Sequence, residues 1–138
     1  MLLNEAILSR HSTRSFRPDP VDRSLLLTLA DAAQQAPSAS NLQVWRFLFI
    51  TDPQLKEKVD LFSPGLSGKP PVILVVCSDM ERAAKKGGKN SEVYGCLMDA
   101  SMAAENLMLK ATELGLGTCA IKSYNDTAVR KILELPER

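Results

Sequence analysis

The chain has 138 residues, 45% of them hydrophobic, which suits one globular domain, residues 1–138, with a core of its own. Its 17 basic and 16 acidic residues leave a formal charge of +1, so no overall field attracts nucleic acid or anionic lipid, and any anion binding must be local. No apolar run approaches the ~20 residues of a membrane span, and the N-terminus lacks a secretory pattern, so we expect a cytoplasmic protein without membrane or nucleic-acid partners.

Two helices are predicted at the start of the chain. Apolar residues from Leu3 to Ile7 recur at helical spacing, and this pattern stops before Pro18, since proline disfavours helix before and at its own position. Asp22 can cap a second helix, in which leucines and alanines recur every three or four residues up to Pro37.

The middle of the chain predicts two strands with a helix between them. Residues 47–50, FLFI, favour a buried strand, and Asp52 followed by Pro53 is typical of a helix start. Residues 72–77, VILVVC, form a continuous run rich in β-branched residues, which predicts a strand covered on both faces. The glycine and lysine cluster at 85–90, KKGGKN, predicts a mobile surface loop.

A long helix is predicted from Val93 to the glycine at Gly115. Its apolar positions step by four and three residues, at Leu97, Ala100, Ala104, Leu107, Ala111 and Leu114. Further apolar residues lie outside this stripe of the helix, at Met98, Ala103 and Met108. We therefore expect the helix to pack against both the core and a subunit interface. Residues 118–121, TCAI, predict a short strand, and Asn125 or Asp126 can cap a last helix.

The cysteines and the histidine argue against a metal site. Cys77, Cys96 and Cys119 are scattered within apolar runs, which favours reduced thiols over disulfides or a metal cluster. His11 is the only histidine in the sequence. We therefore expect no metal to be bound.

The stretch SRHSTRSFRP gathers three arginines and the histidine close to several hydroxyls. In an extended chain Arg10, Ser12 and Arg14 would face one side, where guanidinium groups and a hydroxyl suit phosphate oxygens. A solvated basic turn, with Arg10 interacting only with the carbonyls that end its own helix, explains the pattern equally well. A nucleophile and base pair of Ser12 and His11 is disfavoured, because sequence neighbours point apart.

A second unusual stretch, QQAPSASNLQVWRF, is rich in small hydroxyl and amide side chains. Taken alone, it favours a structural interpretation: Pro37 stops the helix, the serines and Asn41 satisfy local backbone groups, and Trp45 fills core.

Four stretches, taken together and in order, resemble the nitroreductase family of flavin-dependent oxidoreductases. They are RHSTRSF with the following proline turn, APSASNLQVWRFLFITD, DASMAAENLMLKATELGLGT and CAIKSY. The resemblance spans nearly the whole chain. It implies an α+β fold, with a mixed β-sheet flanked by helices, in a homodimer that binds FMN at two interfacial sites.

The resemblance implies a role for each matching residue of an FMN site. Arg10 would be the principal phosphate ligand, His11 and Ser12 would contact phosphate and ribityl, and Arg14 would reach the pyrimidine edge of the flavin. A loop from the other subunit would cover the ring, formed by Pro37, Ser38, Ala39, Ser40 and Asn41. A last segment would lie beside the ring and direct a backbone amide at flavin N5, formed by Ala120, Ile121, Lys122 and Ser123.

The activity implied by the resemblance is reduction of FMN by NAD(P)H, followed by electron transfer to a nitroaromatic, quinone or similar small-molecule acceptor in a ping-pong sequence. The flavin carries this chemistry, so no catalytic side chain is expected, and a cation such as Arg14 would favour the negatively charged reduced cofactor. A low-turnover flavin-binding redox sensor or FMN carrier is the alternative. An anion-binding module without flavin is a third hypothesis.

The chain departs from the family pattern in three places. Many members end with a further strand, a basic pair and a tail that embraces the partner, whereas this sequence stops at LPER, with Glu137 and Arg138. Either these residues lie near a truncation, or a compact variant relies more heavily on its N-terminal donors. The segment from Thr51 to Val93 is short, so we expect an open substrate pocket. Lys122 replaces a residue that is often acidic or glycine, and a solvent-facing lysine is an equal alternative for it.

Overall fold

The structure, a computed structural model, describes residues 1–137; Arg138, named above with the chain end, lies outside the described residues. The first half contains α1 (Leu3–Ser9), α2 (Arg23–Gln34), a 3-10 turn η1 (Ala39–Asn41), β1 (Trp45–Ile50) and α3 (Pro53–Leu61). The second half contains β2 (Ile73–Ser78), α4 (Met80–Asn90), a π-helical turn η2 (Ser91–Gly95), α5 (Cys96–Glu113) and α6 (Asp126–Ile132). The predicted helices and the two predicted central strands are therefore confirmed. No helix in the described residues is long and apolar enough to cross a membrane.

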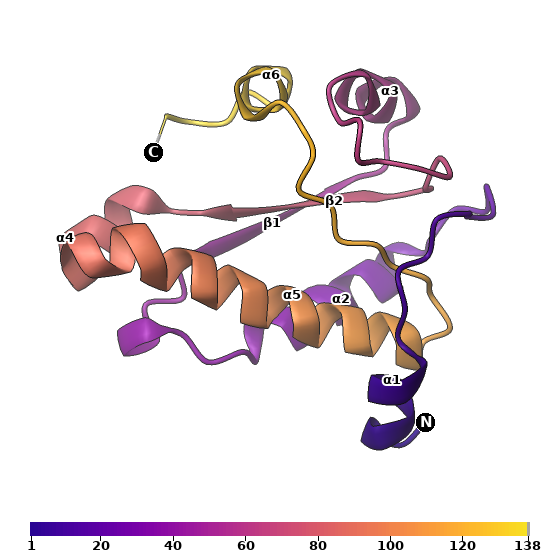
Figure 1. The fold of residues 1–138 in the computed structure, drawn as a ribbon, viewed down its shortest axis with the longest axis horizontal. Coiled ribbons are helices and arrows are strands. Elements are labelled where there is room, and N and C mark those ends of the chain that lie inside the picture. Colours follow the sequence, from indigo (N-terminus) through magenta and orange to yellow (C-terminus); the bar gives the residue numbers. More distant parts are fainter. Residues whose placement is uncertain (138) are drawn as a thin grey trace.

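The two strands form a small antiparallel sheet between two helical layers. Trp45 lies opposite Ser78 and Ile50 opposite Ile73. Helices α2 and α5 cover one face of this sheet, and α3 and α6 cover the other (Figure 1). The α+β class is as predicted, but the expected mixed sheet is not: in residues 1–137 the only parallel pairing is an isolated bridge between Ser12 and Thr118.

Each helical layer has its own hydrophobic core. The core between the sheet, α2 and α5 contains Trp45, as predicted, together with Leu26, Leu29, Ala33, Ala36, Ala103, Leu107 and Ala111. The core on the opposite face joins the strands to α3 and α6 through Ile50, Val59, Ile73 and Val129. Strand β2 is thus covered on both faces, as its continuous apolar run predicts.

The buried face of α5 differs from the predicted stripe. The residues that it buries are Cys96, Asp99, Ala103, Leu107 and Ala111. They recur in steps of three and then four residues, and small alanines let α2 and the sheet approach closely. Leu97 and Met98 face away from this core and are 65% and 62% exposed. The apolar residues of α5 therefore extend onto the surface, where Val93 and Tyr94 of η2 are also exposed.

Helix starts follow the expected chemistry in part. The Asp52 and Asn125 side chains accept hydrogen bonds from the backbone N–H groups of Leu55 and Ala128, at 2.8 and 3.0 Å. Asp22 occupies the cap position of α2 without making a side-chain cap bond.

The predicted loop at residues 85–90 is instead the second half of α4. Asp79 caps this helix by accepting a hydrogen bond from Arg82 N–H at 2.9 Å, and the alanines and lysines that follow are good helix formers. Gly88 kinks the helix with φ of 67°, a conformation that glycine adopts readily. A Cβ at Gly87 would lie 2.4 Å from Ser91 Cβ, so glycine permits this close packing.

The predicted strand at residues 118–121 is also corrected. It pairs only at Thr118, and no ladder follows. A cavity of about 370 Å³ adjoins this segment. Residues 72–76 and 117–121 both line it, and in the described residues only β1 pairs with β2.

Candidate FMN site

The N-terminal donor stretch, residues 9–18, is held by its backbone beside the segment that follows α5. Thr13 N–H donates to Thr118 O at 2.8 Å, next to the Ser12–Thr118 bridge. Gly117 makes this approach possible, because a Cβ there would lie 2.6 Å from Thr13 Oγ1. The backbone therefore forms a strand-like bridge at Ser12 and Thr13.

The side chains of this stretch remain available to a ligand. The Arg10 side chain is 31% exposed, and its one ion pair in the described residues is a 3.8 Å approach of Nε to Glu105 Oε1, too long for a hydrogen bond. His11 is exposed, with Nδ1 3.0 Å from Ser9 O. Ser12 and Arg14 are also exposed, and Arg14 Nη1 donates to Ser12 O at 3.3 Å. Arg10 does not bond the carbonyls that end α1.

The segment from Ala120 to Ser123 adjoins the donor stretch. Ala120, Lys122 and Ser123 are exposed, and Ile121 is half-buried. The segment is held by Gly65 N–H, which donates to Ser123 O at 2.9 Å. Lys122 Nζ lies 5.8 Å from the centre of the Tyr124 ring, a cation–π contact that fits the solvent-facing alternative for this lysine. The structure thus brings two of the three predicted site segments together.

The 370 Å³ cavity opens beside these two segments. Ala120 and Ile121 contribute to its wall, and so does Phe16 from the donor stretch. This cavity is not predictable from local sequence patterns, because its other walls come from α3, β2, α5, α6 and the loops between them. Thr118 also lines it, and the Oγ1 atom of Thr118 is buried without a hydrogen-bond partner.

The third predicted segment, Pro37–Asn41, is an ordered loop with an unusual backbone. Ser40, Asn41 and the following Gln43 have φ of 50°, 52° and 51°, in the left-handed region. Asparagine tolerates this region, but serine and glutamine are strained there by about 1–2 kcal/mol each. The residues nearest the bend, Ser40 and Asn41, are exposed, whereas Ser38 and Ala39 are half-buried.

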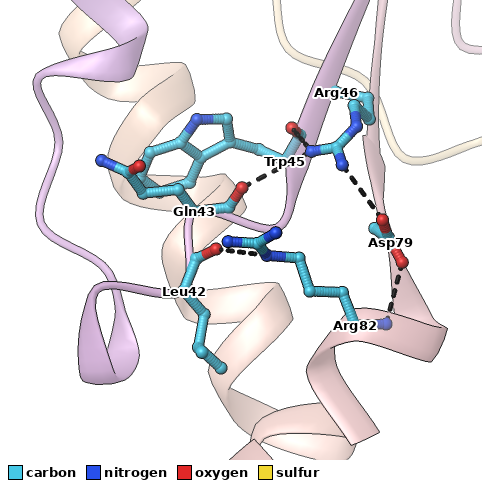
Figure 2. Close-up of polar contacts among 6 residues, drawn as sticks. All are labelled: Leu42, Gln43, Trp45, Arg46, Asp79 and Arg82. Carbon is cyan, nitrogen blue, oxygen red and sulfur yellow. Dashed lines mark hydrogen bonds and ion pairs between the residues drawn. The ribbon is translucent and has the colours of Figure 1, made fainter. Parts of the chain in front are cut away.

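Contacts at both ends hold this loop in place. At its start, both carboxylate oxygens of buried Asp99 accept from Ala39 N–H, at 3.0 and 3.1 Å. At its end, Arg82 Nε donates to Leu42 O at 2.9 Å (Figure 2). The same figure shows Asp79 joining Arg82 N–H to the Arg46 guanidinium, at 2.9 and 3.0 Å. Helices α4 and α5 therefore supply both contacts.

The structure does not bring this loop to the other two segments of the same chain. The loop is anchored at Asp99 in the first turn of α5, whereas the donor stretch pairs with Thr118, which follows the end of α5 at Glu113. At 1.5 Å rise per residue, Asp99 and Glu113 are roughly 21 Å apart. In Figure 1, α1 lies near the end of α5 that is distant from its first turn.

The donor set fits a phosphate-bearing cofactor such as FMN. Two arginines and a hydroxyl lie on one short stretch, and their guanidinium groups are largely uncommitted within the described residues. Such donors make paired, charge-assisted hydrogen bonds to phosphate. The buried Thr118 Oγ1 adds an unused polar atom beside them. Arg10, Ser12 and Arg14 would hold the cofactor's anionic groups.

Two residues that shape the candidate site are absent from the sequence-based expectations. Asp99 and Arg82 act on the Pro37–Asn41 loop over separations of 60 and 40 residues. Asp99 carries one sequence signal: it is an acidic residue within the largely apolar start of α5. Arg82 carries none, because it stands among other basic residues of α4.

The cysteines remain thiols in the described residues, where Cys77, Cys96 and Cys119 are all free. Burial raises the pKa of Cys77, against a smaller opposing effect of the Arg130 charge. A raised pKa keeps Cys77 protonated at neutral pH, which makes it a poor nucleophile.

Comparison with known proteins identifies the family. The model of the nitroreductase family matches residues 7–65 and 61–138. An NADH dehydrogenase of Thermus thermophilus is 30% identical over 95% of this chain and 78% of its own length. An FMN reductase (NADPH) of Bacillus subtilis is 29% identical over 96% of this chain, which spans 59% of that relative. The crystal structure of a nitroreductase family protein from Clostridium novyi superposes with a TM-score of 0.86 at 26% identity, covering 99% of this chain and 78% of that one.

The chain belongs to the nitroreductase family, as its four motif stretches predict. The fold is accordingly nitroreductase-like, with helices around a small sheet.

Proposed function

We propose that this protein is an FMN-dependent oxidoreductase that uses NAD(P)H to reduce a nitroaromatic, quinone or similar small-molecule acceptor. Family membership supports the class of activity. The names of the relatives support the cofactors, since they include an FMN reductase (NADPH) and an NADH dehydrogenase. The observation that carries the proposal is the donor stretch, whose Arg10, Ser12 and Arg14 side chains remain available beside the segment from Ala120 to Ser123.

Bound FMN would accept a hydride from NAD(P)H and pass electrons to the second substrate in a ping-pong sequence. The residues of this chain bind and orient it. Arg10 holds the phosphate, with His11 and Ser12 contributing to phosphate and ribityl binding. Arg14 places a positive charge near the pyrimidine edge, where reduction adds negative charge. Backbone amides near Lys122 and Ser123 would contact the bound flavin.

The proposed active form is a homodimer in which the Pro37–Asn41 loop of one copy covers the cofactor held by the other. The separation of the loop from the donor stretch along α5 supports this arrangement, because one copy alone does not bring them together. Exposed apolar side chains also support it. One group lies beside the loop, at Val93, Tyr94, Leu97 and Met98, and a second lies on and before α1, at Leu2, Leu3, Ile7 and Leu8. Apolar surface gathered in this way is typical of an interface.

The test is the absorption spectrum of the purified protein, followed by rapid mixing with NADPH and, separately, NADH. We expect a flavin band, FMN released on heating, and rapid bleaching by at least one nicotinamide. A bound flavin that neither nicotinamide bleaches would instead indicate a redox sensor or FMN carrier. A colourless protein that takes up no added FMN would contradict the proposal.

A further inference from the structure

The Asp99 carboxylate is the most deeply buried acidic group of the chain's described residues, with only 3% of the residue exposed. Within those residues it forms no salt bridge, and both of its oxygens accept from a single backbone group, Ala39 N–H. A buried carboxylate without a cation is unfavourable for folding unless its hydrogen bonds compensate. Core packing alone therefore does not explain why a carboxylate stands at this buried position and bonds Ala39 N–H.

The backbone that Asp99 holds is a segment that would not adopt its conformation by local preference. Immediately after Ala39, Ser40 and Asn41 have left-handed φ values of 50° and 52°. Local hydrogen bonds close the turn: Asn41 N–H donates to Ser38 O at 2.9 Å, and Leu42 N–H donates to Ala39 O at 3.1 Å. These bonds form only while the strained turn persists, so a contact that fixes Ala39 stabilises all of them.

The loop is held from two helices, α4 and α5, which follow one another along the chain through the η2 turn. Asp99 stands on α5 and holds the start of the loop, while Arg82 on α4 holds its end at Leu42 O (Figure 2). Gly95, at the end of η2, also packs against the start of the loop, because a Cβ added there would lie 3.4 Å from Ala39 Cβ, within ordinary contact distance. The exposed bend at Ser40 and Asn41 lies between the two contacts.

We propose that Asp99 is a positioning residue, which holds the Pro37–Asn41 loop in the conformation that covers the flavin bound by the partner copy. It acts through Ala39 N–H and does not itself touch the cofactor. This inference rests on the proposed function, but the hold of Asp99 on the loop is a property of the flavin-free chain and is tested there.

The experiment compares Asp99→Leu, which is close in size but has no acceptor, with Asp99→Asn, which keeps an oxygen facing Ala39 N–H. In the flavin-free proteins, amide hydrogen exchange is followed in a peptide that spans residues 38–44. We expect Asp99→Leu to speed exchange of the loop amides at least about 10-fold, and Asp99→Asn to stay within about 3-fold of the parent. A peptide that contains the Asp52 cap of α3 serves as an internal control and should not change.

The same variants are then titrated with FMN. We expect Asp99→Leu to weaken binding about 10-fold and Asp99→Asn to restore most of the affinity. Unchanged loop exchange in folded Asp99→Leu would overturn the proposal, and so would equal effects of the two substitutions. Failure of the parent protein to bind FMN would overturn the proposed function and leave the exchange result standing.

If Asp99→Leu does not fold, a substitution in the loop itself tests the same hydrogen bond. Ala39→Pro removes the donor itself, and the preceding Ser38, at φ −139° and ψ 151°, already has the extended backbone that proline requires. We expect the same faster exchange at residues 41–43. Exchange as slow as in the parent would show that the Asp99 contact does not hold the loop.

Discussion

The donor stretch and the Pro37–Asn41 loop are fixed in opposite ways. In the donor stretch the backbone provides the contacts, through Thr13 N–H and Thr118 O, and the Arg10 and Arg14 side chains remain available. In the loop a buried side chain, Asp99, holds the backbone in a strained conformation. The first arrangement suits side chains that bind a ligand, and the second suits a loop whose shape matters more than its functional groups.

The largest expected effect comes from disrupting the proposed homodimer, which would separate the two regions. Replacing Leu97 and Met98 together by glutamate places two charges on the exposed apolar surface beside the loop. Each desolvated charge at an interface core costs about 2 kcal/mol or more, so the dimer dissociation constant should rise at least about 100-fold, with loss of flavin.

Analytical ultracentrifugation measures this change. Leu61→Glu is a control for a surface charge away from this face, since Leu61 is also exposed, at 76%, but lies on α3, on the opposite face of the sheet. A parent protein that is monomeric with FMN bound would contradict the two-copy site. Leu107, which also lies on α5, is unsuitable for the test because it is buried in the core.

The next largest effect is expected at Arg10 and tests whether the donor stretch binds FMN. The proposed Arg10–phosphate hydrogen bonds are charge-assisted and worth about 1.5–3 kcal/mol, so Arg10→Ala should weaken FMN binding roughly 10- to 100-fold. Arg10→Lys keeps the charge without the paired donors, so its FMN dissociation constant should lie between those of the parent and Arg10→Ala. Fluorescence titration measures all three proteins, and an Arg10→Ala dissociation constant equal to that of the parent would remove Arg10 from the site.

The smallest effect separates Arg14 from Arg10 within the same stretch. If the Arg14 charge stabilises reduced flavin by one to two kcal/mol more than oxidised flavin, Arg14→Ala should lower the midpoint potential by roughly 20 to 45 mV. Oxidised FMN should lose less affinity than in Arg10→Ala. A dye-equilibrated reductive titration provides the measurement; a potential that stays constant or rises would place Arg14 elsewhere.

The elements that were predictable from sequence depend on local patterns. Asp52 and Asn125 mark helix starts because a cap involves residues only three apart, and Trp45 stands at the head of a buried strand. The donor stretch was recognisable for the same reason, since its arginines are neighbours. The strand expected at residues 118–121 failed because pairing depends on a partner elsewhere in the chain.

The loop shows what sequence patterns leave out. Left-handed backbone at Ser40 and Gln43 carries no glycine signal, and the Asp99 side chain that bonds Ala39 N–H beside it is 60 residues away in the sequence. The loop predicted at residues 85–90 was wrong for a similar reason. Gly87 and Gly88 suggest a loop, whereas the Asp79 cap and the packing of Gly87 against Ser91 support a kinked helix.

The most direct test of the central claim is complementation between two defective proteins. Arg10→Ala damages the donor stretch, and Ser40→Pro damages the loop, because proline cannot adopt the φ of 50° found at Ser40. In a mixed dimer one site carries both defects and the other carries neither. Random pairing should therefore restore tight FMN binding at about one quarter of all sites after the two proteins are unfolded and refolded together. If the mixture binds no more tightly than the separate variants, the two regions do not form one site across two copies.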